Sequence, residues 1–162
     1  MTYSIEARIY HATCLFTYDS SDRLTEAREV LIAEVVNHSV TVEDTSHIAF
    51  VAAYSESGAL VSTRSTIGSN TQEIRFEYKQ PLIPNTKNQF TTALTFGPYF
   101  LSTLRPFMFA GLFGKASASL PSAFSLYYNS QYQRSSELTY DFDPDGSIKA
   151  EKVGGLQIWE YQ

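Results

Sequence analysis

Apolar and polar residues alternate with a period of two along much of the chain. Residues 72–78 show the pattern most clearly, with Ile74 and Phe76 on one side and Glu73 and Arg75 on the other. Successive side chains of a strand point to opposite faces, so this alternation predicts half-buried β-strands. The segments with strand character are 3–10, 47–54, 59–63, 72–78, 91–96, 123–128, 138–142, 147–152 and 156–161.

Turn residues punctuate these segments. The cluster 55–58 (Ser-Glu-Ser-Gly) separates two strand-like runs and predicts a hairpin. Pro144-Asp145-Gly146 and Gly154-Gly155 are strong turn signals near the C-terminus. About nine or ten short strands with frequent turns predict one all-β domain over residues 1–162, an antiparallel β-sandwich or a closed barrel.

Two segments also fit a helix, so the prediction includes at most one or two short helices. Residues 22–36 place Leu24 and Ala27 at helical spacing, but residues 30–36 fit a strand equally well, and we expect either a switch from helix to strand or a mostly extended segment. Residues 100–117 have apolar residues at helical spacing, and Pro106 weakens that interpretation.

Composition indicates a soluble globular protein. The chain has 162 residues, 43% of them hydrophobic, which is ample for a core. The formal net charge of −5 gives no reason to expect nucleic acid as a partner. Cys14 is the only cysteine, so no internal disulfide can form. We find neither a signal-peptide pattern nor an apolar run long enough for a transmembrane segment, and therefore expect a cytoplasmic protein.

The charge distribution is uneven. Between Tyr78 and Arg134 the sequence has five basic residues and no Asp or Glu, and it holds more than half of the aromatic residues. A basic, aromatic surface suits an anionic or zwitterionic ligand, whereas a buried central region would explain the same bias. The predicted ligand-binding residues are Arg105, Lys115, Tyr127, Tyr128, Tyr132 and Arg134.

Residues 106–115 form the most apolar part of this stretch. Phe107, Phe109 and Phe113 stand among glycines without period-2 polarity. We expect the segment to pack inside the protein or against a second subunit. The alternative is an exposed patch for a membrane or a partner.

No motif establishes a metal or catalytic site. The spacing of Asp141, Asp143 and Asp145 before Gly146 resembles a calcium loop, but lysines occupy the later positions where that loop needs further ligands, including its Glu. We interpret the segment as a hairpin turn and predict no metal and no cofactor. The three histidines lie at no metal-binding spacing, and no nucleophile-elbow motif is present, so catalytic residues stay unknown.

The N-terminal strand resembles a known family. Met1-Thr2-Tyr3-Ser4-Ile5, followed by Arg8-Ile9-Tyr10, is similar to the first strand of fungal fruit-body lectins. The resemblance implies an actinoporin-like β-sandwich in the cytosol that binds glycans.

Together these features favour a non-enzymatic ligand-binding module that recognises a glycan or a lipid headgroup through a basic, aromatic-rich surface. The alternative is a β-barrel with a small apolar ligand in its interior, a cyclase or isomerase in which buried polar residues such as His47 or Arg75 act. A third hypothesis is a structural subunit that assembles through strand edges, and a homo-oligomer is left open.

Overall fold

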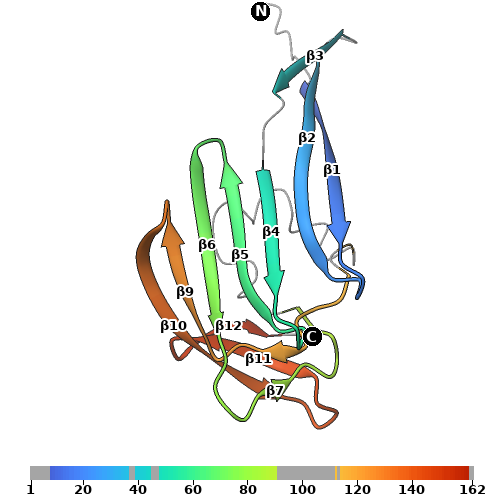
Figure 1. The fold of residues 1–162 in the computed structure, drawn as a ribbon. Helices are drawn as coiled ribbons and strands as arrows, with labels where there is room; N and C mark the ends of the chain where they lie inside the picture. The colour runs from blue at the N-terminus through green and yellow to red at the C-terminus, as the bar shows by residue number, and fades with distance from the viewer. Residues whose placement is uncertain (1–7, 37–38, 45–47, 91–111, 113, 161–162) are drawn as a thin grey trace, which may run out of the picture.

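The computed structural model describes residues 8–36, 39–44, 48–90, 112 and 114–160, and the described part is all-β without a helix. Figure 1 shows the strands in chain order. Their bounds are β1 Arg8–Tyr18, β2 Leu24–Val36, β3 Ser39–Asp44, β4 Ile48–Tyr54, β5 Leu60–Ile67, β6 Asn70–Glu77, β7 Ile83–Pro84, β8 Ser119–Leu120, β9 Ala123–Tyr128, β10 Gln131–Phe142, β11 Ile148–Val153 and β12 Leu156–Glu160.

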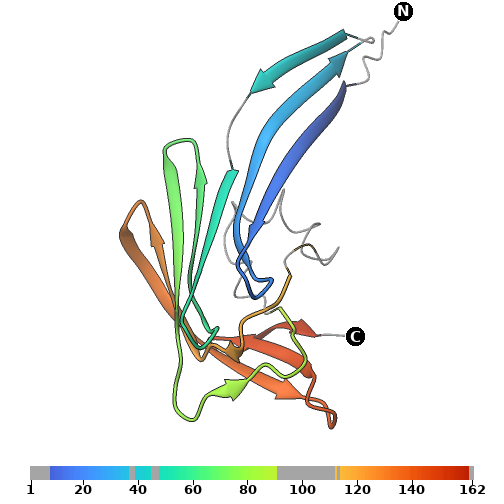
Figure 2. The ribbon, with the colours of Figure 1, turned by 45° about the vertical axis from the view of Figure 1, so that its right-hand side comes forward.

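Ten of these strands form one antiparallel sheet in the order β1-β2-β4-β5-β6-β9-β10-β11-β12, with β3 paired to β2, while β7 and β8 form a separate pair. The strands β1, β2 and β3 extend beyond the neighbouring hairpins as an arm (Figure 2). The two end strands, β1 and β12, do not pair with each other, so the described strands form an open sheet. An antiparallel β-sandwich, one of the two predicted architectures, is compatible with this arrangement, and the described strands do not close into a barrel.

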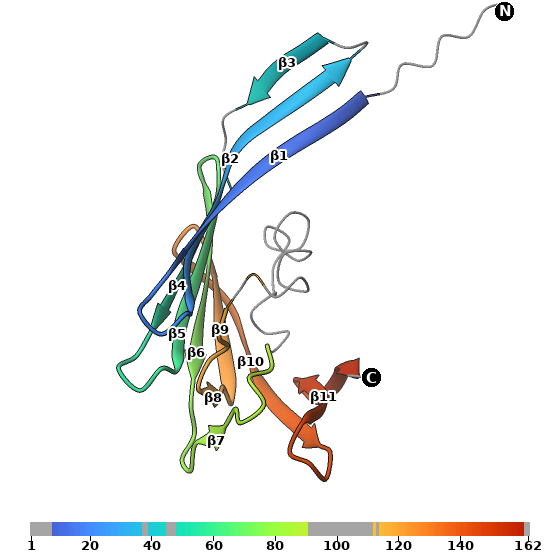
Figure 3. The same cartoon turned by 90° about the vertical axis from the view of Figure 1, so that its right-hand side faces the viewer.

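The core lies on one face of the sheet. Buried apolar side chains come from strands across its width, among them Leu24, Phe50, Ile74, Phe124 and Leu138. The first half of the long strand β10 pairs with β9, and its second half pairs with β11. The strands β11 and β12 therefore lie to one side of the other strands (Figure 3). Exposed positions alternate with buried ones along β5 and β6. The exposed side chains lie on the opposite face of the sheet, which we call the open face.

Several sequence predictions are confirmed. The predicted hairpin around 55–58 joins β4 to β5, where Ser55 N donates to Ala59 O and Gly58 adopts a φ of 84°. Residues 24–36 are extended as β2, because β1, β3 and β4 offer backbone partners along the strand. The helical interpretation of 100–117 falls mostly outside the described residues, but Gly114 forms an isolated β-bridge with Arg23.

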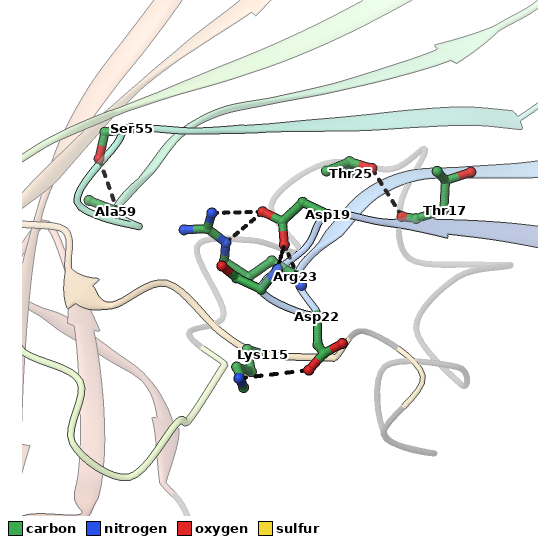
Figure 4. Close-up of polar contacts among 9 residues, drawn as sticks. Thr17, Asp19, Asp22, Arg23, Thr25, Ser55, Ala59 and Lys115 are labelled. Atoms are coloured by element: carbon green, nitrogen blue, oxygen red, sulfur yellow. Dashed lines mark hydrogen bonds and ion pairs between the residues drawn. The ribbon is translucent and has the colours of Figure 1, made fainter.

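The turn between β1 and β2 is fixed by side-chain contacts (Figure 4). The Arg23 guanidinium pairs with the Asp19 carboxylate, with Nη2 2.7 Å from Oδ2, and it lies over the Tyr54 ring at 4.7 Å. Lys115 N donates to Asp22 O, so the segment that leads into β8 is held against this turn. Leu112, at the end of the apolar 106–115 segment, is 43% exposed, and most of that segment lies outside the described residues.

Candidate functional site

A row of polar and aromatic residues crosses four neighbouring strands on the open face. In the register of the sheet, Arg64 of β5 is opposite Glu73 of β6, Glu73 is opposite Tyr127 of β9, and Tyr127 is opposite Tyr132 of β10. Directly opposed residues of antiparallel strands share a face, so all four lie together, and Arg75 follows two positions after Glu73 on the same face. We call Arg64, Glu73, Arg75, Tyr127 and Tyr132 the cross-strand row.

The Glu73 carboxylate is the centre of this row. Arg75 Nε donates to Glu73 Oε1 at 2.7 Å, and Arg64 Nη2 donates to Oε2 at 3.2 Å. The hydrogen bond from Arg75 holds the pKa of Glu73 below its ordinary value; partial burial opposes this shift, and Arg64 adds to it. The same pairing raises the pKa of Arg75. Glu73 is therefore ionised near neutral pH, which suits a hydrogen-bond acceptor.

The two tyrosines differ in accessibility. The Arg75 guanidinium lies 4.4 Å from the centre of the Tyr127 ring, in cation–π geometry. Tyr132 meets Tyr127 edge-on, with ring centres 5.8 Å apart, and its hydroxyl donates to Ser135 Oγ. Tyr132 is 57% exposed. Because Arg75 covers a face of Tyr127, Tyr132 is the exposed aromatic surface of the row.

A polar hollow lies beside the row and is lined by residues of β5, β6 and the β5–β6 and β9–β10 turns. These two turns lie at the same end of the sheet (Figures 1 and 2). The hollow is open to solvent and has a volume of about 470 Å³. We call it the hairpin hollow. Its lining residues are Arg64, Thr66, Ser69, Thr71, Glu73, Asn129 and Ser130.

Asn129 fastens the two turns to each other. Its backbone N donates to Thr71 O, its Oδ1 accepts from Thr71 N at 2.8 Å, and its Nδ2 donates to Asn70 Oδ1. Asn129 and Ser130 have φ values of 47° and 64°, as a two-residue hairpin turn requires. The shape of the hairpin hollow is thereby set before any ligand arrives.

The predicted ligand-binding residues do not lie together in the structure. Tyr127 and Tyr132 belong to the cross-strand row. Tyr128 is opposite Gln72, and Arg134 is opposite Leu126, which places both on the other face of the sheet. Lys115 lies at the β1–β2 turn, 3.8 Å from the Asp22 carboxylate, and Arg105 lies outside the described residues.

Arg64 and Glu73 were not predicted as site residues, and Arg75 was named only for the interior of a barrel. The available signal was the polar side of the alternation in 72–78, which identifies an exposed face. What the sequence did not reveal is the register that sets Arg64 beside Glu73.

The described lysines of the acid-free stretch each pair with an acidic residue from outside it, and the basic surface stays a prediction. Lys79 pairs with Glu137 at 2.9 Å, and Lys87 pairs with Asp145 at 3.3 Å. Lys115 pairs with Asp22 in the same way. The reason is tertiary: acids from the flanking parts of the sequence fold against the stretch that has none.

The Asp141–Asp145 segment contains the predicted hairpin turn between β10 and β11. Gly146 N donates to Asp143 O, and Asp145 accepts hydrogen bonds from Ser147 N and Oγ. These bonds, with the contribution of Lys87, hold the pKa of Asp145 below its ordinary value. Asp141 pairs with Lys152 at 2.6 Å. The carboxylates thus have cation and turn partners, and absent or weak calcium binding stays a prediction.

Among the described residues, no group of three or more His, Cys, Asp or Glu side chains is placed to hold a metal ion. The same residues contain no helix that is long and apolar enough to cross a membrane.

No protein-family model and no curated protein sequence matches the chain. Among solved structures, the fold is similar to a porin-like protein from Bacteroides uniformis, with a TM-score of 0.55 and 14% sequence identity. The match covers 93% of this chain and 56% of the porin-like protein, so the chain spans about half the length of that neighbour. At this identity the likeness shows a shared β-fold.

Proposed function

We propose that this chain is a non-enzymatic binding module that takes a saccharide at the cross-strand row. The observation that carries the proposal is the exposed Tyr132 ring on the same face as the paired Arg64, Glu73 and Arg75 side chains, with Tyr127 between them. A sugar ring has an apolar C–H face and a rim of hydroxyls. An aromatic ring covers the first, and carboxylate and guanidinium groups bind the second.

Charge favours a saccharide over a lipid headgroup. A choline-type cation is best held among several open aromatic faces, whereas Tyr132 is the exposed ring of the cross-strand row and a face of Tyr127 is covered by the Arg75 guanidinium. An anionic headgroup needs unpaired cations, whereas Arg64 and Arg75 both pair with Glu73. The resemblance of the first ten residues to fungal fruit-body lectins supports the same class of ligand.

Glu73 supports binding over catalysis. Hydrolysis of a glycosidic bond uses two carboxyl groups, one of which is protonated as a general acid. The pKa of Glu73 is lowered by Arg75 and Arg64, so this group stays charged. It accepts hydrogen bonds and has no proton to donate at neutral pH.

A glycan array with the purified chain, followed by titration calorimetry with the tightest glycan, tests the proposal. Tyr132→Ala should weaken binding about tenfold, the size of one lost stacking contact. Tyr128→Ala is the matched control, because Tyr128 lies on the other face, and it should leave affinity unchanged. Absence of any glycan binding, or binding to lipid vesicles alone, would contradict the proposal, as would binding that depends on Tyr128 and not on Tyr132.

A further inference from the structure

The hairpin hollow has a lining suited to hydroxylated ligands. Its lining residues are all charged, hydroxyl-bearing or amide-bearing. The hydroxyls of Thr66, Ser69, Thr71 and Ser130 make no hydrogen bond to another described residue. Hydroxyl groups donate and accept, so together they can match the mixed donors and acceptors around a sugar ring.

The hairpin hollow and the exposed Tyr132 ring lie on the same face of the sheet, but two strands apart. Arg64 and Glu73 belong to both the hollow and the cross-strand row. Tyr132 is two strands away from Glu73, about 10 Å at the usual strand spacing, with Tyr127 between them. A single pyranose ring stacked on Tyr132 therefore leaves the hollow empty, and a second ring is needed to fill it.

The charges on this face alternate in sign. Beyond Arg64, Glu73 and Arg75, the same face carries Glu26, which is in line with Arg64 through Val51. It also carries Arg28, two positions after Glu26, and Glu77, two positions after Arg75. An anionic sugar would meet carboxylates next to each guanidinium. An uncharged sugar uses both groups without repulsion.

From these observations we infer that the hairpin hollow is a second sugar subsite, and that the ligand is a neutral oligosaccharide of at least two pyranose rings lying across β5, β6, β9 and β10. This inference rests on the proposed function, since it extends the Tyr132 site to a neighbouring ring. Asn129 acts as a positioning residue, because its side chain holds the two turns and not the ligand.

Chain-length dependence tests the inference. The probes are mono-, di- and tetrasaccharides built from glucose, galactose, mannose or N-acetylglucosamine, measured by titration calorimetry. A disaccharide of the preferred sugar should bind at least about tenfold more tightly than the monosaccharide. Thr66→Val with Thr71→Val keeps side-chain shape and removes two hydroxyls of the hollow. It should abolish this gain and leave the monosaccharide affinity unchanged.

The outcomes separate the two proposals. Equal affinity for mono- and disaccharide, or a gain that survives the double Val variant, overturns the second subsite. The binding function stands in that case if Tyr132→Ala still removes binding. Tighter binding of a disaccharide that carries glucuronate than of its neutral counterpart overturns the preference for uncharged sugars. If no member of the series binds, both proposals are overturned.

Discussion

At the scale of single residues, Arg23 shows how one side chain restricts its neighbours. It is held by the Asp19 carboxylate on one side and by the Tyr54 ring on another. The hydrogen bonds from Arg23 hold the pKa of Asp19 below its ordinary value. A Cβ at Gly58 would lie 2.7 Å from Arg23 Nη1. The positive φ of Gly58 favours glycine at this position, and any larger residue would also have to move the Arg23 guanidinium.

We expect Gly58→Ala to destabilise the fold more than Gly68→Ala does. Both positions have positive φ, but a Cβ at Gly68 meets nothing within 4 Å, so Gly68→Ala measures the backbone cost alone. Gly58→Ala must also displace Arg23 from Asp19, and the difference should be about 1–2 kcal/mol. Urea unfolding of both variants measures it. Equal losses would show that Arg23 moves aside without cost.

Tyr54 gives a pH dependence of stability. Burial raises its pKa from 10.0 to about 12. Below pH 10 the folded and unfolded states both keep the proton. Between pH 10 and 12 only the unfolded state loses it, so stability falls as the pH rises, by at most about 3 kcal/mol from this group.

Tyr54→Phe removes the titrating hydroxyl and keeps the ring under Arg23. Unfolding measured from pH 8 to pH 12 should fall less steeply for this variant than for the natural sequence. The comparison between the two curves cancels the other groups that titrate in this range. Parallel curves would mean that the Tyr54 hydroxyl is solvated in the folded state.

At the scale of elements, the strands that bury one face were predictable and the others were not. The alternation in 72–78 reproduces β6, because its inward positions are buried and its outward ones are polar. The first half of β10, residues 131–137, is mostly exposed and has no such pattern. The strand β3 was missed as well, and β2 was ambiguous with a helix until its partner strands were known. The site was found only in part for the same reason, since Arg64 and Glu73 meet through register.

Substitution of Asn129 tests whether its side-chain hydrogen bonds between the β5–β6 and β9–β10 turns stabilise the fold. Asn129→Ala should lower stability by about 1–3 kcal/mol, because the bonds to Thr71 N and Asn70 are lost and φ is positive. Asn129→Gly loses the same bonds but tolerates the φ, so it should lie between the Ala variant and the natural sequence. Unfolding midpoints for the three chains measure this order. Should the Gly variant match the natural sequence, the side-chain bonds contribute nothing.

At the scale of the whole molecule, charge is organised by tertiary contacts that the sequence does not display. The acid-free stretch between Tyr78 and Arg134 is visible in the sequence, and a basic surface was a reasonable expectation from it. Folding brings Glu137, Asp145 and Asp22 to its described lysines, and the net charge of the chain is −5. The open face instead presents charges of both signs around exposed aromatic surface, which suits an uncharged polar ligand.

Membrane contact through the apolar 106–115 segment is the remaining alternative at this scale. The described end of the segment is tied to the β1–β2 turn, where Tyr18 Oη donates to Leu112 O and Lys115 N donates to Asp22 O. Burial of its three phenylalanines would be favourable by several kcal/mol, at roughly 25 cal/mol per Å². We therefore predict that the segment packs within the protein or against a second subunit.

Co-sedimentation with neutral phosphatidylcholine vesicles, at low and at high salt, should leave the natural chain in the supernatant. Phe109→Asp is the matching variant. If Phe109 is packed, the buried carboxylate costs several kcal/mol, and the unfolding midpoint falls sharply. If Phe109 enters a bilayer, the variant stays as stable as the natural chain and loses only vesicle binding. Strong binding of the natural chain to neutral vesicles, abolished in a stable Phe109→Asp chain, would contradict burial and make the segment a membrane anchor.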